Sequence, residues 1–393
     1  MPMALDGVKV LELANFWAGP TAGMYLGDQG ADVIKIESPA GDECRRFTSR
    51  REHGNESPSF LVANRNKRGM VLDLSLPESK EVLHRLVKWS DVIIHNYREA
   101  GARKMGILYE DLAPLNPGLI YVHVSAYGDK GPMAHFPGYD LVCQGLAGQM
   151  ERRDSNGHPI GPGMFATDGA AGLLLAYGVA LALLERGKTG RGQKVETSLL
   201  QMAIGIQHVA MVHVMNDPPA TPIVANLSPS MPYLCSDERW VLPVPVGDRQ
   251  FHAAYRVLGD PRLQGGDFLT SLQRAERVEE LVGIFAHNFA KKPRDEWVQL
   301  FIEADVPITP ITDRSEVFDV EQVQANGMIV EAEHPTMGRH RMTQVPLTLS
   351  KTPGAVRTTS PMQGQHTAEI MWEMGYEDAD IQRLHGAGVL PII

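Results

Sequence analysis

The chain has 393 residues and a mass of 43.2 kDa, which is enough for two or three domains. Its 43% hydrophobic and 21% charged residues indicate a globular protein and exclude collagen, coiled coil and extensive disorder. A formal net charge of −10 argues against nucleic acid as a partner, because a phosphate backbone attracts basic surfaces.

Sequence signals for secretion, membrane insertion and metal binding are missing. The N-terminal MPMALDGVKVLEL lacks the features of a signal peptide, and no apolar run reaches the ~18 residues needed to cross a membrane. Cys44, Cys143 and Cys235 are odd in number and form no CxxC pair, which favours a reducing compartment. The histidines show no HxxxH or HExxH spacing. We therefore expect a soluble cytoplasmic protein with no membrane partner and no metal.

Strand and helix patterns alternate over the first ~125 residues. The predicted strands are 8–13, 32–36, 69–74, 91–95 and 119–125, and the predicted helices between them include 18–30 and 77–89. Strand, helix and strand in close succession form βαβ units, whose parallel strands need helices on both faces. The sequence therefore predicts an α/β fold with a Rossmann-like parallel sheet.

The central part of the chain contains two apolar helical patterns and a proline-rich boundary. The pattern at 169–185 is apolar around nearly its whole circumference, which predicts a helix buried inside the protein and too short to span a membrane. A strand at 194–198 and a helix at 199–214 follow. Residues 216–232 carry five prolines and indicate a linker. Beyond it we expect a smaller α+β domain at 233–325.

Two aspartates start predicted helices. Asp168 opens the apolar helix, where it is either an ordinary N-cap or a partly desolvated carboxylate that the helix dipole keeps ionised as a nucleophile. Asp140 follows Tyr139 after a Pro-Gly turn, and either shares a cleft with Asp168 or caps its own helix beside a packed tyrosine.

Polar and basic residues follow the strand 91–95. Asn96 and Tyr97 come directly after it, at the strand end where open α/β sheets bind ligands. Arg103 and Lys104 lie about two turns further on, where they either meet phosphates or form a solvated helix face.

Several motifs together resemble one known family. They are LDGVKVLELANFWAGPTAGMYLGDQGADVIKIESPAGDECR, NRNKRGMVLDL, DVIIHNYREAGARKMG, LNPGLIYVHVSAYGDKGP, PGYDLVCQGLAG, ATDGAAGLLLAYGVALALLERGKTGRGQKVETSLL and GQHTAEIM. In this order they are similar to the class III coenzyme A transferases of the CaiB/BaiF group, which includes formyl-CoA transferase, carnitine-CoA transferase and α-methylacyl-CoA racemase. The resemblance implies a large domain built from residues 1–215 and 326–393, the small domain between them, and an interlocked homodimer.

The resemblance also implies a reaction and its residues. Asp168 is expected to attack an acyl-CoA thioester, so that coenzyme A passes to an acceptor acid through aspartyl anhydride and aspartyl-CoA intermediates. Coenzyme A is then a co-substrate, and no cofactor is tightly bound. The implied acyl-pocket residues are Trp17, Tyr139 and Asp140, and the implied CoA-binding residues are Asn96, Tyr97, Arg103 and Lys104.

Two departures from the family pattern bear on specificity. The racemases carry a histidine where this chain has Tyr139, and a phenol is a poor base for an α-proton at neutral pH. CoA transfer is therefore favoured over the alternatives of an acyl-CoA racemase or isomerase and a non-catalytic acyl-CoA binding protein. Trp17 replaces a glutamine of the formyl-CoA transferases, and VPVGDRQ stands where they have a tetraglycine loop. A bulkier acyl group than formyl or oxalyl is expected.

Overall fold

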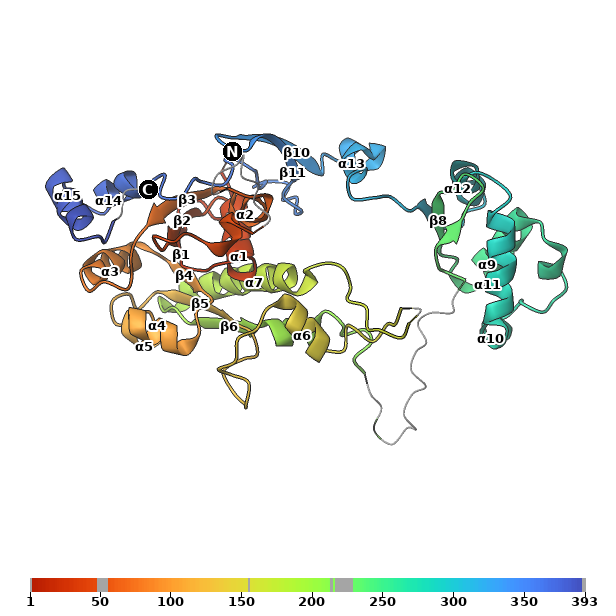
Figure 1. The fold of residues 1–393 in the computed structure, drawn as a ribbon, viewed down its shortest axis with the longest axis horizontal. Helices are drawn as coiled ribbons and strands as arrows, with labels where there is room; N and C mark the ends of the chain where they lie inside the picture. Colours follow the sequence, from red (N-terminus) through yellow and green to blue (C-terminus); the bar gives the residue numbers. More distant parts are fainter. Residues whose placement is uncertain (1, 48–55, 155, 213–214, 216–228, 391–393) are drawn as a thin grey trace. The chain divides into compact units, whose positions relative to one another are not determined.

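The computed structural model describes residues 2–47, 56–154, 156–212, 215 and 229–390. The chain divides into two compact units (Figure 1). The first consists of Met1–Val212 and Gln322–Ile393, so both ends of the chain contribute to it, and the second of His213–Glu321. Most of the predicted linker, residues 216–228, lies outside the described residues.

A sheet of six parallel strands forms the centre of the first unit, in the order β3-β2-β1-β4-β5-β6. The strands are β1 Lys9–Glu12, β2 Asp32–Glu37, β3 Lys67–Val71, β4 Val92–His95, β5 Ile120–Ser125 and β6 Lys194–Ser198. The chain winds outward from β1 to β3 and then returns to β4 on the other side of β1, which is the doubly wound arrangement. The predicted α/β fold with a parallel sheet is confirmed.

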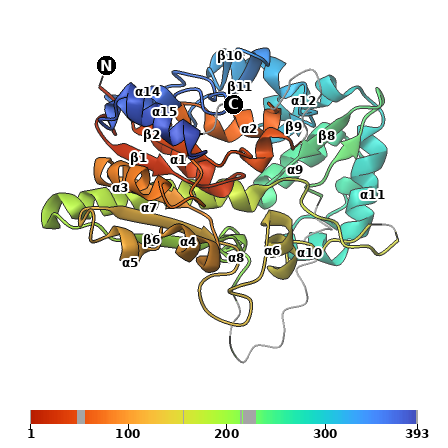
Figure 2. The same ribbon diagram turned by 60° about the vertical axis from the view of Figure 1, so that its left-hand side comes forward.

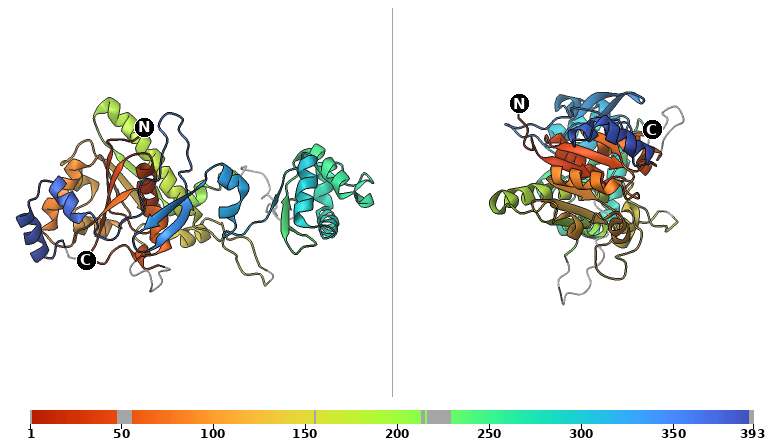
Figure 3. Two further views of the ribbon diagram at one scale, coloured as in Figure 1. Left: turned by 90° about the horizontal axis from the view of Figure 1, so that it is seen from above. Right: turned by 90° about the vertical axis from the view of Figure 1, so that its left-hand side faces the viewer.

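Helices cover both faces of this sheet and bury two separate apolar clusters. One face carries α3 Ser79–Trp89, α4 Glu99–Met105, α5 Tyr109–Leu112, α14 Thr367–Glu373 and α15 Asp378–Gly386. The other carries α1 Ala18–Asp28, α6 Asp140–Leu146, α7 Ala166–Thr189 and α8 Leu199–Gly205. Figure 3 (left) shows the blue C-terminal helices beside the orange N-terminal ones, so the end of the chain completes a core that its beginning starts.

Helix α1 packs closely between the sheet and α7 because its sequence is rich in glycine (Figure 2). A Cβ atom on Gly23 would lie 1.9 Å from a carboxylate oxygen of Glu12 on β1. On α7, a Cβ atom on Gly172 would lie 2.5 Å from Cβ of Thr21 in α1. Gly172 comes one turn after Asp168, so this close approach brings the start of α7 toward the loop that connects β1 to α1.

Helix α7 differs from the prediction in length and in burial. It has 24 residues and, among the described residues, is the one helix whose length and composition would allow it to cross a membrane. The prediction that the segment is too short was therefore wrong, although long apolar helices in protein cores have the same properties. Its buried side chains include Ala171, Leu175, Val179 and Ala182. Large apolar side chains on its other side are exposed, namely Leu173, Tyr177, Leu181 and Leu184. The prediction of a helix buried all round is thus wrong for the single chain.

Helix α8 is shorter than predicted. It ends at Gly205 rather than continuing to residue 214, and the side chain of Gln207 donates hydrogen bonds to the carbonyl oxygens of Ala147 and Ala203. The remaining elements of the first unit are α2 Pro58–Asn64, most of α13 Glu321–Ala325 and an antiparallel hairpin of β10 Ile329–His334 with β11 Gly338–Thr343.

In its described residues, the second unit combines a small antiparallel sheet with four α-helices. Its strands are β7 Tyr233–Leu234, β8 Trp240–Pro243 and β9 Ile308–Pro310, and its helices are α9 Gly247–Leu258, α10 Ser271–Glu276, α11 Val278–Phe289 and α12 Arg294–Glu303. An aromatic core lies between them, in which Phe289 contacts Trp297 and Phe301. This unit has the α+β character that the sequence predicted.

Candidate active site

A cleft of about 1770 Å³ opens at the carboxyl ends of β1, β4 and β5, within the first unit. Residues that follow these strands line it, including Asn15, Asn96 and Ala126. Strands β1 and β4 are neighbours, and the chain leaves them in opposite directions across the sheet. Open α/β sheets bind their ligands at this switch point, because the two loops diverge and leave a crevice.

All of the residues that sequence analysis selected for the site line this one cleft. They are Trp17, Asn96, Tyr97, Arg103, Lys104, Tyr139, Asp140 and Asp168. Four different loops or helix starts supply them: the β1–α1 loop, the segment from β4 into α4, the start of α6 and the start of α7. The fold therefore gathers residues that are up to 151 positions apart.

Asp168 is not the N-cap of α7. Phe165 occupies the cap position without a side-chain hydrogen bond, and Asp168 is the third residue of the helix. The missing cap comes from Asp140: its Oδ2 atom accepts the backbone N–H of Asp168 at 2.8 Å, and its carboxylate also accepts the N–H of Thr167. Asp140 therefore holds the end of α7 from a neighbouring helix, which satisfies donors that a helix start leaves unpaired.

The side-chain amide of Gln144, one turn later in α6, fixes the position of Asp140. Its Nε2 atom donates a hydrogen bond to Oδ1 of Asp140 and another, of 3.0 Å, to the carbonyl oxygen of Met164. Asp140 is buried, and burial raises its pKa, although these hydrogen bonds act in the opposite direction. Asp140 thus holds the start of α7 rather than capping its own helix, where Tyr139 occupies the cap position without a side-chain hydrogen bond.

Burial, and to a smaller extent the neighbouring Asp140 carboxylate, raises the pKa of Asp168 to about 7. One of the two alternatives from the sequence was a partly desolvated carboxylate that the helix dipole keeps ionised. The raised pKa agrees with the desolvation, but the dipole does not offset it, because a helix end contributes roughly 0.3–1 kcal/mol, which is less than the cost of desolvating a charge. Near neutral pH the group is divided between its acid and its more nucleophilic carboxylate form.

Asn96 is engaged in holding the β1–α1 loop. Its Oδ1 atom accepts the N–H of Asn15 at 3.0 Å, and its Nδ2 atom donates to the carbonyl oxygen of Asn15 at 2.7 Å. The Tyr97 hydroxyl accepts a weaker hydrogen bond from Asn15 at 3.4 Å. Both residues therefore shape the wall of the cleft, besides being available to a ligand along it.

The two basic residues of α4 differ in their surroundings. Arg103 forms an exposed ion pair with Glu99 at 2.6 Å, whereas Lys104, also exposed, has no ion-pair partner among the described residues. An ammonium group without a protein partner at the rim of a cleft is free to meet a phosphate. Lys104 is therefore the stronger candidate of the two for an anionic ligand.

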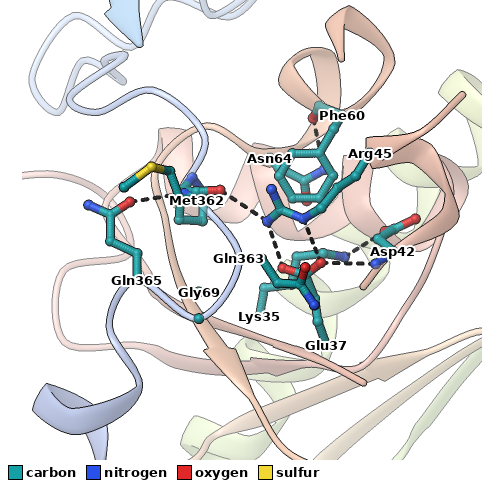
Figure 4. A network of polar contacts seen from close by, with 12 residues as sticks. Lys35, Glu37, Asp42, Arg45, Phe60, Asn64, Gly69, Met362, Gln363 and Gln365 are labelled. Atoms are coloured by element: carbon teal, nitrogen blue, oxygen red, sulfur yellow. Dashed lines mark hydrogen bonds and ion pairs between the residues drawn. The ribbon is translucent and has the colours of Figure 1, made fainter. Parts of the chain in front are cut away.

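A buried ionic network, which Figure 4 shows in part, contacts the β1–α1 loop. Asp42 forms an ion pair with Lys35 at 3.0 Å and accepts the backbone N–H of Phe16 at 3.2 Å. Its own backbone N–H donates to Glu37, which holds the guanidinium of Arg45 with two hydrogen bonds of 2.7 Å. The sequence did not reveal this network, because Lys35 in strand 32–36 pairs with Glu12 and Asp42, which lie in other segments of the chain.

Sequence analysis also missed three phenylalanines that line the cleft, Phe16, Phe47 and Phe165. Phe16 and Phe165 stand next to residues it did consider, Trp17 and the ATDG motif, so proximity to these was the available signal. It also missed a group at the edge of the cleft, His123, Asp129 and Glu196, whose possible metal-ligand atoms lie within 4.8 Å of one another. Both acids are exposed, and Lys194 lies 3.9 Å from Glu196, so repulsion between the acids is already reduced without a metal.

Comparison with known proteins defines the class of this protein. The chain is 33% identical to human succinyl-CoA:glutarate CoA-transferase, over 98% of this chain and 90% of that protein. It is 31% identical to cinnamoyl-CoA:phenyllactate CoA-transferase from Clostridium sporogenes, over 96% and 95% of the two chains. The crystal structure of a CaiB/BaiF family protein from Brucella suis matches with a TM-score of 0.81 and 29% identity, over 95% of this chain and all of that one.

The protein is therefore an enzyme of the CoA-transferase class, with coenzyme A as co-substrate. The model of CoA-transferase family III matches residues 5–367, and the chain belongs to that family.

Proposed function

We propose that the enzyme moves coenzyme A between carboxylic acids by covalent catalysis at Asp168. The observation that carries this proposal is the place of its carboxylate: at the start of α7, in the cleft at the switch point of the sheet, with a pKa of about 7. A carboxylate with a raised pKa is a stronger nucleophile than a solvated one, and half of it is ionised at neutral pH.

The proposed reaction begins when an oxygen of the Asp168 carboxylate attacks the thioester carbonyl carbon. The C–S bond breaks, coenzyme A leaves as a thiolate, and a mixed anhydride remains. The thiolate then attacks the aspartyl carbonyl, which releases the donor acid and forms an aspartyl-CoA thioester. The acceptor carboxylate attacks this thioester, its C–S bond breaks, and a second mixed anhydride forms while coenzyme A leaves again as the thiolate. Finally, the thiolate attacks the acceptor's acyl carbon and restores Asp168.

Each remaining residue has a role that its contacts support. Asp140 holds the backbone of Asp168, which fixes the point from which its side chain starts. Trp17 and Tyr139 border the acyl group, and Lys104, with Arg103 and the Asn96–Tyr97 segment, binds coenzyme A along the cleft.

Trapping with hydroxylamine tests the covalent step. Incubation with an acyl-CoA and hydroxylamine is expected to convert the Asp168 side chain into a hydroxamate, detectable by peptide mass spectrometry. Asp168→Asn should abolish both trapping and CoA exchange, whereas Asp313→Asn, an exposed aspartate of the second unit, should leave both unchanged. Exchange that survives in Asp168→Asn would refute the proposal. Solvent deuterium that enters the α-carbon of the acyl group without an acceptor acid would identify a racemase. Binding of acyl-CoA without any turnover would identify a non-catalytic binding protein.

We further propose that the protein is a cytoplasmic homodimer whose subunits interlock. Four of the exposed apolar side chains of α7, those of Leu173, Tyr177, Leu181 and Leu184, recur every three or four residues and form one stripe, and Leu174 beside Leu173 is also exposed. Exposed apolar surface of this kind is covered in stable assemblies. All three cysteines are buried free thiols, which supports a reducing compartment. Light scattering should give the mass of a dimer, and Leu181→Glu should reduce it to that of a monomer.

A further inference from the structure

The β1–α1 loop fixes one wall of the cleft in a strained conformation. Phe16 has φ of +63°, a left-handed backbone conformation that is costly for a large side chain. Hydrogen bonds from both sides hold it there: Asn96 binds the preceding residue and Asp42 accepts the N–H of Phe16 itself. Such strain persists only where the surroundings impose it, so the wall is preformed.

This loop presents Trp17 in a single orientation. The indole N–H donates to the carbonyl oxygen of Ser59 at 2.9 Å, which leaves the ring faces for apolar contacts. The Trp17 ring lies 4.5 Å from that of Phe165 and 5.8 Å from that of Phe47, measured between centroids. Three aromatic side chains from three distant segments therefore meet at one point of the cleft, beside the start of α7.

Besides this cluster of three rings, one pair of aromatic side chains, Phe16 and Tyr139, lies in the same cleft. Phe16 contacts the ring of Tyr139 edge-on, with centroids 5.3 Å apart. Phe47, Phe165 and Tyr139 are 47%, 46% and 57% exposed, so much of their ring surface faces open space. Aromatic surface exposed inside a concave site gains free energy when an apolar group covers it, and offset or edge-on ring contacts add to this gain.

The charges around Asp168 disfavour a second carboxylate on the substrate. Asp140 is the one charged group that affects the pKa of Asp168 among the described residues, and it is an acid. Four cations line the cleft, namely Arg46, Arg98, Arg103 and Lys104, but none of them affects the pKa of Asp168. A second substrate carboxylate placed directly beside Asp168 would therefore add a negative charge where, among the described residues, no cation acts on Asp168, which is costly in a desolvated site.

We propose that the acyl group transferred by this enzyme is an uncharged arylalkanoyl group, whose ring packs against Trp17, Phe47 and Phe165. This inference rests on the proposed CoA transfer and names its substrate class. The aromatic cluster selects the substrate by covering its ring, and the acidic surroundings of Asp168 reject dicarboxylic acids. Trp17 is then the principal specificity-determining residue.

Isotope exchange measures this specificity for one acyl group at a time. The enzyme is incubated with 3-phenylpropionyl-CoA and ¹³C-labelled 3-phenylpropionate, or with glutaryl-CoA and labelled glutarate, and label entering the thioester is followed by mass spectrometry. We expect kcat/KM for phenylpropionyl exchange to exceed that for glutaryl exchange by about tenfold or more, the discrimination typical of apolar pockets. Equal rates, or faster glutaryl exchange, would overturn the inference and leave CoA transfer intact. No exchange with either acid would overturn both.

Variants test whether the aromatic cluster causes the preference. Trp17→Gln and Phe47→Gln should each reduce the phenylpropionyl-to-glutaryl ratio by about tenfold, because each removes ring surface from the pocket. Trp372→Gln replaces an exposed tryptophan outside the cleft and should leave the ratio unchanged. Phe47 is half exposed, so its replacement is expected to fold even if that of Trp17 does not. A ratio unchanged in folded Phe47→Gln would exclude the cluster as the selecting element.

Discussion

Replacing the proposed nucleophile should make the protein more stable, and by an amount that depends on pH. In the folded chain the pKa of Asp168 is raised from 3.8 to about 7, mainly by burial. The unfolded chain therefore loses this proton at lower pH than the folded chain does. Stability that the neutral group provides is present below pH ~4 and is lost as the pH rises toward 7. An asparagine cannot ionise and avoids this loss.

The size of the effect follows from the same two pKa values. Each tenfold difference in proton affinity corresponds to 1.36 kcal/mol, so Asp168→Asn should raise the free energy of unfolding by at most about 4 kcal/mol at pH 8. At pH 5 the unfolded carboxyl is already mostly ionised while the folded one is neutral, and the gain should fall to about 2 kcal/mol. The active site thus reduces stability in exchange for reactivity.

Urea unfolding at pH 5 and pH 8 measures this difference, at one protein concentration because the proposed dimer would make stability concentration-dependent. Asp313→Asn is the matched control, since this aspartate is exposed and makes no side-chain hydrogen bond within the described chain. A variant less stable than the wild type at pH 8 would refute the reasoning. The same holds for a gain that does not change between the two pH values, because burial of charge would then not be its cause.

Three further predictions concern the residues around Asp168. Asp140→Asn removes a negative charge beside Asp168, so the acid limb of the pH profile of kcat/KM should move to lower pH, and a limb that stays in place would contradict this. Asp140→Ala should lower the free energy of unfolding by about 1–2 kcal/mol, because it removes the cap of α7. Asn96→Ala loses two hydrogen bonds to the β1–α1 loop and should lower the free energy of unfolding by roughly 1–3 kcal/mol, measured with urea, whereas a neutral change would show that the loop is held elsewhere. Lys104→Gln should raise KM for acyl-CoA about fivefold at low salt, and Arg103→Gln less, because its charge is already paired; the reverse order in initial-rate assays would reject Lys104 as the CoA contact.

Local patterns in the sequence were sufficient for the architecture. Period-two and continuous apolar runs located the strands of the parallel sheet, and β6 has the predicted bounds, Lys194–Ser198. Glycine-rich α1 and apolar α7 were also recognisable, since packing against a sheet requires small or apolar residues over many consecutive turns. Position along the chain selected the candidate site residues other than Trp17, the family resemblance added Trp17 and the expected roles, and the fold gathers all of them in one cleft.

Contacts between distant segments could be decided only by the tertiary structure. Glu12 is a fully buried charge in a predicted strand, and the strand pattern gives no indication of what neutralises it. Its partners are Lys35 and Lys67, which the next two strands of the sheet bring beside it. The cap that Asp140 places on α7 bridges 28 residues, and no helix signal near Asp168 indicates it.

The same reason explains the remaining differences. Composition showed that α7 is apolar, but which of its sides packs against α1 depends on the position of Gly172 over Thr21. The raised pKa of Asp168 depends on how much water the assembled cleft excludes, which is a property of its neighbours in space. Periodicity and composition are properties of neighbouring residues and can be read along the chain, whereas burial, charge pairing and helix capping across the fold arise only when distant segments meet.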